Sequence, residues 1–224
     1  MAGVPASSGG SAASPGAGTR RKVTALAAAL AARGIVKGDR ILVHSKNCDE
    51  MFWSMFAAFR LGAVWVPTNF RLMPDEVRWL ATASGAKAFL CHGDFPDHAA
   101  AVKAASSTLD FTWRIGDSGS FGERAVAEAM AAHADTQVEE ARVDYNDLCW
   151  FFFTSGTTGR SKAAVLTHGQ MAFVVTNHLA DLMPSTTEAD ASLVVAPLSH
   201  GAGIHQLAQV ARGAKTVIPV SERL

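Results

Sequence analysis

Seven short apolar segments recur along this chain, and stretches with the composition of helices separate most of them. Strands that alternate with helical segments are typical of α/β domains, in which helices cover sheets whose strands run largely parallel. The sequence therefore predicts an α/β fold with layered, largely parallel sheets and flanking helices. The strands are expected near residues 40–45, 63–67, 88–91, 149–154, 163–167, 193–197 and 215–220.

The predicted helices have features of core-forming segments. A helix over residues 24–33 should end at Gly34, because glycine readily adopts the left-handed conformation that closes a helix. A helix over residues 49–61 carries an aromatic stripe at helical spacing, which is more typical of a core-facing surface than of a ligand cage. We expect the side chains of this stripe to pack in the core: Phe52, Phe56 and Phe59.

Composition limits the classes of function. Twenty basic and twenty acidic side chains cancel, which removes the electrostatic argument for a nucleic-acid partner. Cys48, Cys91 and Cys149 stand far apart, and no Cys-x-x-Cys pair suggests a zinc site or a disulfide framework. Buried thiols in a reducing compartment, the cytoplasm, are the expectation. No run approaches the roughly 18 apolar residues of a membrane span.

The first twenty residues are mostly Ala, Gly, Ser and Pro, a composition that cannot bury enough surface to fold, and we expect residues 1–20 to be disordered. Arg20-Arg21-Lys22 and the apolar run after it also resemble the start of a twin-arginine signal peptide. However, this run continues into the turn that precedes the first predicted strand, which favours a folded segment.

The segment from Trp150 to His168 is the most informative one for function. An apolar strand leads into a loop rich in hydroxyls and glycines that ends in a lysine. Glycines let backbone N–H groups approach an anion closely, while hydroxyls donate hydrogen bonds and the lysine adds a positive charge. A hydroxyl-rich turn between two strands is the alternative. We predict a polyphosphate site built by Thr154, Ser155, Gly156, Thr157, Thr158, Gly159 and Lys162.

This loop does not fit the Walker pattern Gly-x-x-x-x-Gly-Lys-Ser/Thr. Two residues separate Gly156 from Gly159, and Lys162 does not directly follow the second glycine. The segment resembles instead the signature Thr-Ser-Gly-Thr-Thr-Gly-x-x-Lys of the AMP-forming adenylation superfamily, which includes the acyl-CoA synthetases. The match from Thr154 to Lys162 has no gap, and Thr167-His168 continues it.

A second segment supports the resemblance. The run 192–197 has the pattern of a buried strand, and Leu198-Ser199-His200-Gly201-Ala202-Gly203 follows at its end, where open α/β sheets place ligands. In acyl-CoA synthetases a Pro-Leu-x-His-x-x-Gly segment holds this place, and the resemblance implies that His200 borders the acyl and adenylate pocket. A histidine in a glycine-rich turn can otherwise serve as a backbone cap. An esterase oxyanion segment would need a Gly-x-Ser-x-Gly elbow, which this sequence lacks.

The resemblance implies carboxylate activation, in which ATP and an organic acid give an acyl-adenylate and CoA takes the acyl group. It implies ATP, Mg²⁺ and CoA as cofactors and co-substrates, with Thr154 as a magnesium contact. It covers residues 23–224, and we expect residues 21–224 to be an incomplete N-terminal adenylation domain that self-associates when expressed alone. The alternative is a truncated, non-catalytic remnant that at most binds nucleotide. The identity of the acid is left open.

Overall fold

The computed structural model of the chain describes residues 12–13, 17–154 and 161–219. Its main feature is a sheet of seven strands in the order β6-β5-β4-β2-β3-β7-β8. Neighbouring strands run parallel, apart from the antiparallel pair β7 and β8. The strands are β2 (Arg40–His44), β3 (Val64–Thr68), β4 (Ala88–His92), β5 (Phe111–Ile115), β6 (Arg124–Ala125), β7 (Leu148–Thr154) and β8 (Lys162–Thr167).

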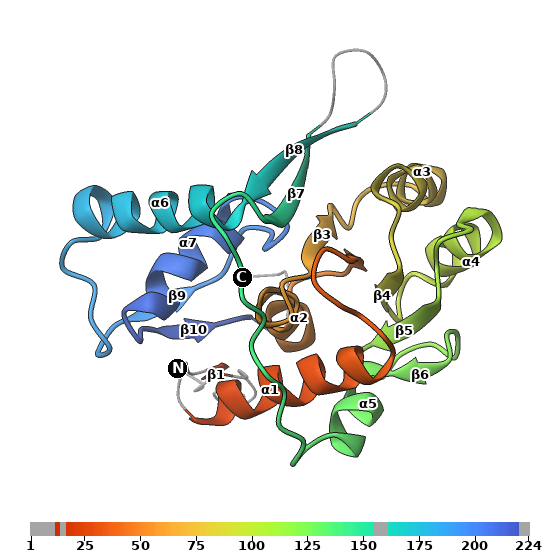
Figure 1. Ribbon diagram of the computed structural model, residues 1–224, viewed down its shortest axis with the longest axis horizontal. Coiled ribbons are helices and arrows are strands. Elements are labelled where there is room, and N and C mark those ends of the chain that lie inside the picture. The colour runs from red at the N-terminus through yellow and green to blue at the C-terminus, as the bar shows by residue number, and fades with distance from the viewer. Residues whose placement is uncertain (1–11, 14–16, 155–160, 220–224) are drawn as a thin grey trace, which may run out of the picture.

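Helices cover both faces of this sheet (Figure 1). Side chains alternate between the two faces of a strand, and in β2 Ile41 and Val43 pack in one hydrophobic cluster while Leu42 packs in the other. The first cluster takes α1 (Ala17–Ala32), α2 (Asp49–Arg60) and α5 (Val126–Ala132), and the second takes α3 (Pro74–Ser84) and α4 (Pro96–Ala105).

A smaller sheet of three strands, in the order β1-β10-β9, lies on the α2 side of the main sheet (Figure 1). The pair β9 and β10 is parallel, and β1 is antiparallel to β10. The elements of this part are β1 (Ala12–Ala13), α6 (His168–Asn177), the π-helical turn η1 (His178–Leu182), β9 (Ala191–Leu193), α7 (Gly201–Ala211) and β10 (Lys215–Val217).

The predicted fold class is confirmed, with differences in several strands. The segment predicted as a buried strand over 193–197 is β9 at Ala191–Leu193, and Val195 beyond it is 62% exposed. Pro197 lacks an N–H group, and the segment before it leaves the sheet to enter a turn. The strand expected at 215–220 is β10, which ends at Val217. The strands β5 and β6 were missed, because residues 95–147 contain mainly helical and turn signals. The short strand β1 was also missed, because it lies in the segment 1–20 expected to be disordered.

Two other expectations can be compared with the structure. The helix expected at 24–33 is α1, which begins at Ala17 and ends at Ala32, so four of its residues lie in the segment 1–20 expected to be disordered. Residues 1–11 and 14–16 lie outside the described residues. In the aromatic stripe, Phe52 is 2% exposed, and Phe56 and Phe59 pack against the core, as expected.

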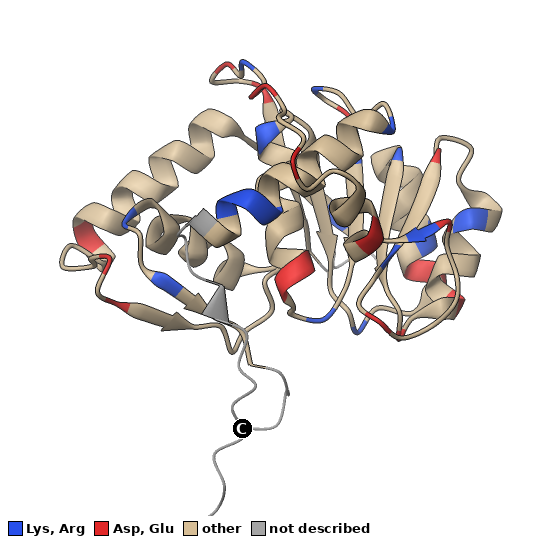
Figure 2. Cartoon of the chain, turned by 90° about the horizontal axis from the view of Figure 1, so that it is seen from below, with Lys and Arg blue, Asp and Glu red and all other residues tan. Residues whose placement is uncertain are grey.

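Charges of both signs are interspersed over the chain in the view of Figure 2. This distribution matches the equal numbers of acidic and basic residues in the sequence. Of the helices in the described part of the chain, none combines the length and the apolar character that crossing a bilayer requires.

Candidate functional site

The strands β7 and β8 form a hairpin that extends away from the rest of the molecule (Figure 1). Their register pairs Thr154 with Lys162, and the Thr154 hydroxyl donates to the Lys162 carbonyl oxygen at 3.5 Å. The structure therefore brings these two predicted site residues together at the mouth of the loop. The other predicted residues of the loop lie outside the described residues: Ser155, Gly156, Thr157, Thr158 and Gly159.

Strand β7 is aromatic on both faces. Trp150 and Phe152 belong to the cluster on the α2 side, whereas Phe151 and Phe153 pack on the α3 and α4 side. The ring of Trp150 meets that of Trp65 from the neighbouring β3 edge to face, with the ring centroids 4.6 Å apart. Thr154 lies two residues beyond Phe152, so it belongs to the same face of the hairpin as Phe152.

His200 lies next to this face. It is the residue at the N-cap position of α7, but its side chain makes no capping hydrogen bond, so the capping alternative does not describe it. Its half-buried ring packs edge to face against Phe152, with the centroids 5.4 Å apart. The structure thus places His200 and Thr154 along one face of the hairpin.

Only one of the two glycines that flank Ala202 is required for this arrangement. A Cβ atom on Gly203 would lie 2.3 Å from the Leu198 carbonyl oxygen and 2.7 Å from the Trp150 ring, whereas a Cβ on Gly201 would meet nothing within 4 Å. Gly203 therefore lets the first turn of α7 approach both the Leu198 turn and β7.

Asn47 is a residue of this site that the sequence analysis missed. Its side-chain N–H donates to the Ala196 carbonyl oxygen at 2.8 Å, and its side-chain oxygen accepts from the Leu198 N–H at 2.8 Å. The residue follows β2, at the carboxyl edge of the main sheet, and this position after a parallel strand is the signal that could have drawn attention to it.

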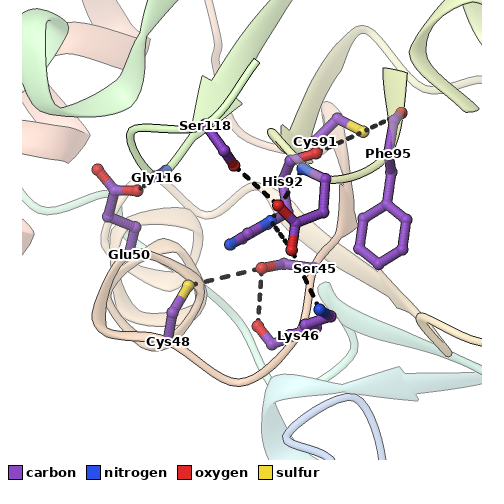
Figure 3. A network of polar contacts seen from close by, with 10 residues as sticks. Ser45, Lys46, Cys48, Glu50, Cys91, His92, Phe95, Gly116 and Ser118 are labelled. Carbon is purple, nitrogen blue, oxygen red and sulfur yellow. Dashed lines mark hydrogen bonds and ion pairs between the residues drawn. The ribbon is translucent and has the colours of Figure 1, made fainter. Parts of the chain in front are cut away.

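A polar network joins the loops that follow β2, β4 and β5 at this edge (Figure 3). Asp94 accepts from Lys46 at 3.0 Å and from the Ser118 hydroxyl at 2.9 Å, and these hydrogen bonds lower the pKa of its carboxyl group. The Glu50 carboxylate accepts from the Gly116 N–H, and burial raises the pKa of Glu50. The network ties three loops into one platform.

Beside Lys46, the Ser45 hydroxyl donates to the Lys46 carbonyl oxygen at 2.7 Å and lies 3.5 Å from the Cys48 sulfur. Cys48 is the N-cap of α2, and its sulfur accepts from the Met51 N–H at 3.4 Å. Burial raises the pKa of this thiol to about 11, so it is a neutral structural group. Cys91 and Cys149 are buried free thiols, in agreement with the expectation from the sequence.

Burial lowers the pKa of two histidines near the site, the fully buried His44 and the half-buried His168. Nδ1 of His44 lies 2.7 Å from the Thr68 hydroxyl, its ring stacks on His98 at 4.4 Å, and burial lowers its pKa to about 3. His168 begins α6 and packs against Phe59 with the ring centroids 5.9 Å apart, and burial is the main cause of its lowered pKa. His168 supports the hairpin from its base.

The described residues contain no group of three or more His, Cys, Asp or Glu side chains that could hold a metal ion. Mg²⁺ commonly keeps several waters and binds through substrate phosphates with few protein ligands. The Thr154 hydroxyl at the loop mouth fits such a cation as a single contact. The residues that the structure describes therefore fit a magnesium ion that a phosphate ligand carries, and among them no metal cage forms.

Comparison with known proteins points to one family. A family model described as AMP-binding enzyme matches residues 17–224. The feruloyl-CoA synthase of an Amycolatopsis species is 33% identical over 184 residues, which are 82% of this chain and 34% of that protein. The chain spans about a third of the length of the curated relatives it matches, and it corresponds to their N-terminal portion.

Solved structures agree on the fold. The inhibitor-bound N-terminal domain of FACL13 from Mycobacterium tuberculosis superposes with a TM-score of 0.77 at 28% identity, over 90% of this chain and 49% of that one. The anthranilate CoA ligase AuaEII, in complex with anthranoyl-AMP, gives a TM-score of 0.83 at 21% identity over 92% of this chain and 40% of that one. At that identity the second likeness concerns the fold alone.

Proposed function

The chain belongs to the family of AMP-binding enzymes, and on this basis we propose that it is the first part of the adenylation domain of an acid–CoA ligase. Its place is the cytoplasm, which its buried free thiols support. The proposed domain comprises residues 21–224, and the proposed substrates are a carboxylic acid, ATP and CoA.

One observation carries the proposal: Thr154 and Lys162 face each other where the loop of the signature begins and ends. Lys162 is exposed, and the described residues give it no ion-pair partner, so its charge is free for an anionic ligand. We assign the β- and γ-phosphates of ATP to Lys162, to the Thr154 hydroxyl and to residues 155–159 between them.

In the proposed reaction, a carboxylate oxygen of the acid attacks the α-phosphorus of ATP. The bond from this phosphorus to the bridging oxygen breaks, and pyrophosphate leaves with the electron pair. Donors that are already in place stabilise the negative charge as it develops on the leaving group, and Lys162 is the cation for this role. Mg²⁺, when bound with the nucleotide, supplies further charge neutralisation. The thiol of CoA then attacks the acyl carbon, and AMP leaves.

His200 is assigned to the border of the acyl and adenylate pocket. Its ring lies on the face of the hairpin that also carries Thr154, and its side chain is not used to cap α7. A half-buried imidazole next to an aromatic ring can contact both a carboxylate and an apolar acyl group. This position supports a role in acid binding.

The test is exchange of labelled pyrophosphate into ATP by the complete gene product, with a panel of fatty and aromatic acids. We expect exchange that depends on an acid, and a fall of at least tenfold for Lys162→Ala because a charged hydrogen bond to the leaving group is lost. Lys215→Ala, which removes another exposed lysine at the start of a strand, is the matched control. Nucleotide binding without exchange would support the non-catalytic alternative, and unchanged exchange in Lys162→Ala would exclude the assigned role.

A further inference from the structure

We propose that Asn47 is a positioning residue for His200, and that it fixes the turn from Ala196 to His200 against the main sheet. The inference rests on the proposed function, because it assumes that His200 contacts the acid. Asn47 and this turn are about 150 residues apart in the sequence, and two hydrogen bonds join them.

The two hydrogen bonds define the orientation of the Asn47 amide. One end donates to the Ala196 carbonyl oxygen and the other accepts from the Leu198 N–H, both at 2.8 Å. A rotation of the amide by half a turn would place donor against donor and acceptor against acceptor. Asn47 therefore binds the residues on both sides of Pro197. Proline itself has no N–H group that could hold the segment.

The bracketed turn leads directly to His200. The His200 N–H donates to the Pro197 carbonyl oxygen at 3.0 Å, and the His200 carbonyl oxygen accepts from the Gly203 N–H at 3.0 Å. Asn47 thus holds the start of a short turn whose end is the first helical turn of α7. A shift of Ala196 or Leu198 would be passed to the His200 backbone and to the ring that packs on Phe152.

Asn47 itself is held on both sides by the network of Figure 3. The residue before it, Lys46, binds Asp94, and the residue after it, Cys48, caps α2 through the Met51 N–H. A side chain with two anchored neighbours has little freedom to follow the turn. The platform at the carboxyl edge of the main sheet therefore sets the place of His200, which belongs to the part of the chain around the smaller sheet.

A tether that only stabilises the fold would affect both substrates alike. A positioning residue for His200 should affect the acid in particular, because the phosphate contacts are assigned to the hairpin and its loop. For Asn47→Ala in the complete gene product we expect kcat/KM for the acid to fall by roughly tenfold and the KM for ATP to change by less than twofold. Asn146→Ala, in an exposed turn, is the matched control.

The double mutant separates a direct effect from one that acts through His200. If Asn47 works through this ring, Asn47→Ala should add less than a further twofold loss in a His200→Ala background. A full tenfold loss in that background would overturn the proposal. Asn47→Asp keeps the acceptor for the Leu198 N–H but turns a carboxylate oxygen toward the Ala196 carbonyl oxygen, so it should also lower kcat/KM for the acid. This variant serves if Asn47→Ala does not fold.

A second measurement does not depend on activity. Reaction of histidines with diethyl pyrocarbonate, followed by mass spectrometry, should be several-fold faster at His200 in Asn47→Ala and unchanged at His133, the residue that follows α5. An unchanged rate at His200 would refute the positioning role. If the wild-type protein exchanges no label with any acid, the proposed function fails, and this measurement still decides whether Asn47 holds His200.

Discussion

Replacing Gly203 by alanine should disturb the site through a single methyl group. The added Cβ atom would lie 2.3 Å from the Leu198 carbonyl oxygen and 2.7 Å from the Trp150 ring. Neither neighbour is the end of a flexible side chain, since one is backbone and the other is a fully buried indole. We therefore expect α7 or the Leu198 turn to move, and His200 to move with it.

The size of the effect follows from two opposing contributions. Overpacking of a well-filled core costs about 1–3 kcal/mol, and alanine in place of glycine in a helix gains at most ~1 kcal/mol. The difference leaves a net loss in the free energy of unfolding of about 0–2 kcal/mol, and the 2.3 Å approach to a backbone oxygen places Gly203→Ala toward the upper end of this range. Gly201→Ala in the same helical turn has no steric cost and should be neutral or stabilising by up to ~1 kcal/mol.

The measurement is urea unfolding of the complete gene product and its two variants, followed by tryptophan fluorescence. Gly203→Ala should have the lower midpoint, and acid-dependent pyrophosphate exchange should fall in this variant alone. Equal free energies of unfolding for Gly201→Ala and Gly203→Ala would refute the steric reasoning. Lower stability with unchanged exchange would show that the packing of α7 does not control His200.

Two further predictions concern pH and association. Because burial lowers the pKa of His44 to about 3, the unfolded chain binds a proton below pH ~6.5 that the folded chain does not, so stability should fall as the pH drops from ~6.5 toward 3. In urea unfolding, the free energy of unfolding should fall by about 2 kcal/mol between pH 7.5 and 5. The fall should be smaller in His44→Asn, which retains a nitrogen or oxygen near Thr68. An equal fall in both proteins would exclude His44 as the cause. Residues 1–224 expressed alone should elute as oligomers in size-exclusion chromatography, because Phe173, Leu193 and Val195 are more than half exposed. They should also release no AMP, because they span about a third of the length of the related ligases. A monodisperse monomer that releases AMP would contradict both parts of this expectation.

Much of the fold could be predicted because its signals are local. The apolar runs at β2, β3, β4, β7 and β8 are each bounded by turn residues, and the hairpin register follows once β7 and β8 flank a short loop. The signature from Thr154 to Lys162 identified the superfamily for a similar reason, since its residues are contiguous. These five strands and the predicted polyphosphate loop could therefore be predicted from the sequence.

The rest depends on contacts between distant segments. The segment Pro-Leu-x-His-x-x-Gly has its glycine at Gly203 and not at Gly201, but the physical reason, the approach of Trp150 and Leu198, is visible only in the structure. Asn47 is an ordinary polar residue after a strand until the fold brings Ala196 and Leu198 to its amide. The run 192–197 has the composition of a strand, but Pro197 and these hydrogen bonds hold its second half in a turn.

The edge-to-face pair of Trp65 and Trp150 joins the β7–β8 hairpin to the first five strands of the sheet. Two indoles this close, in a fixed relative orientation, couple their electronic transitions and give a near-ultraviolet circular dichroism signal that vanishes when the packing is lost. Trp150 also touches the site of Gly203, and the Trp65 N–H is fixed by the Ser54 hydroxyl at 3.0 Å. The circular dichroism of this tryptophan pair therefore reports whether the β7–β8 hairpin is packed against β3, and no added label is needed.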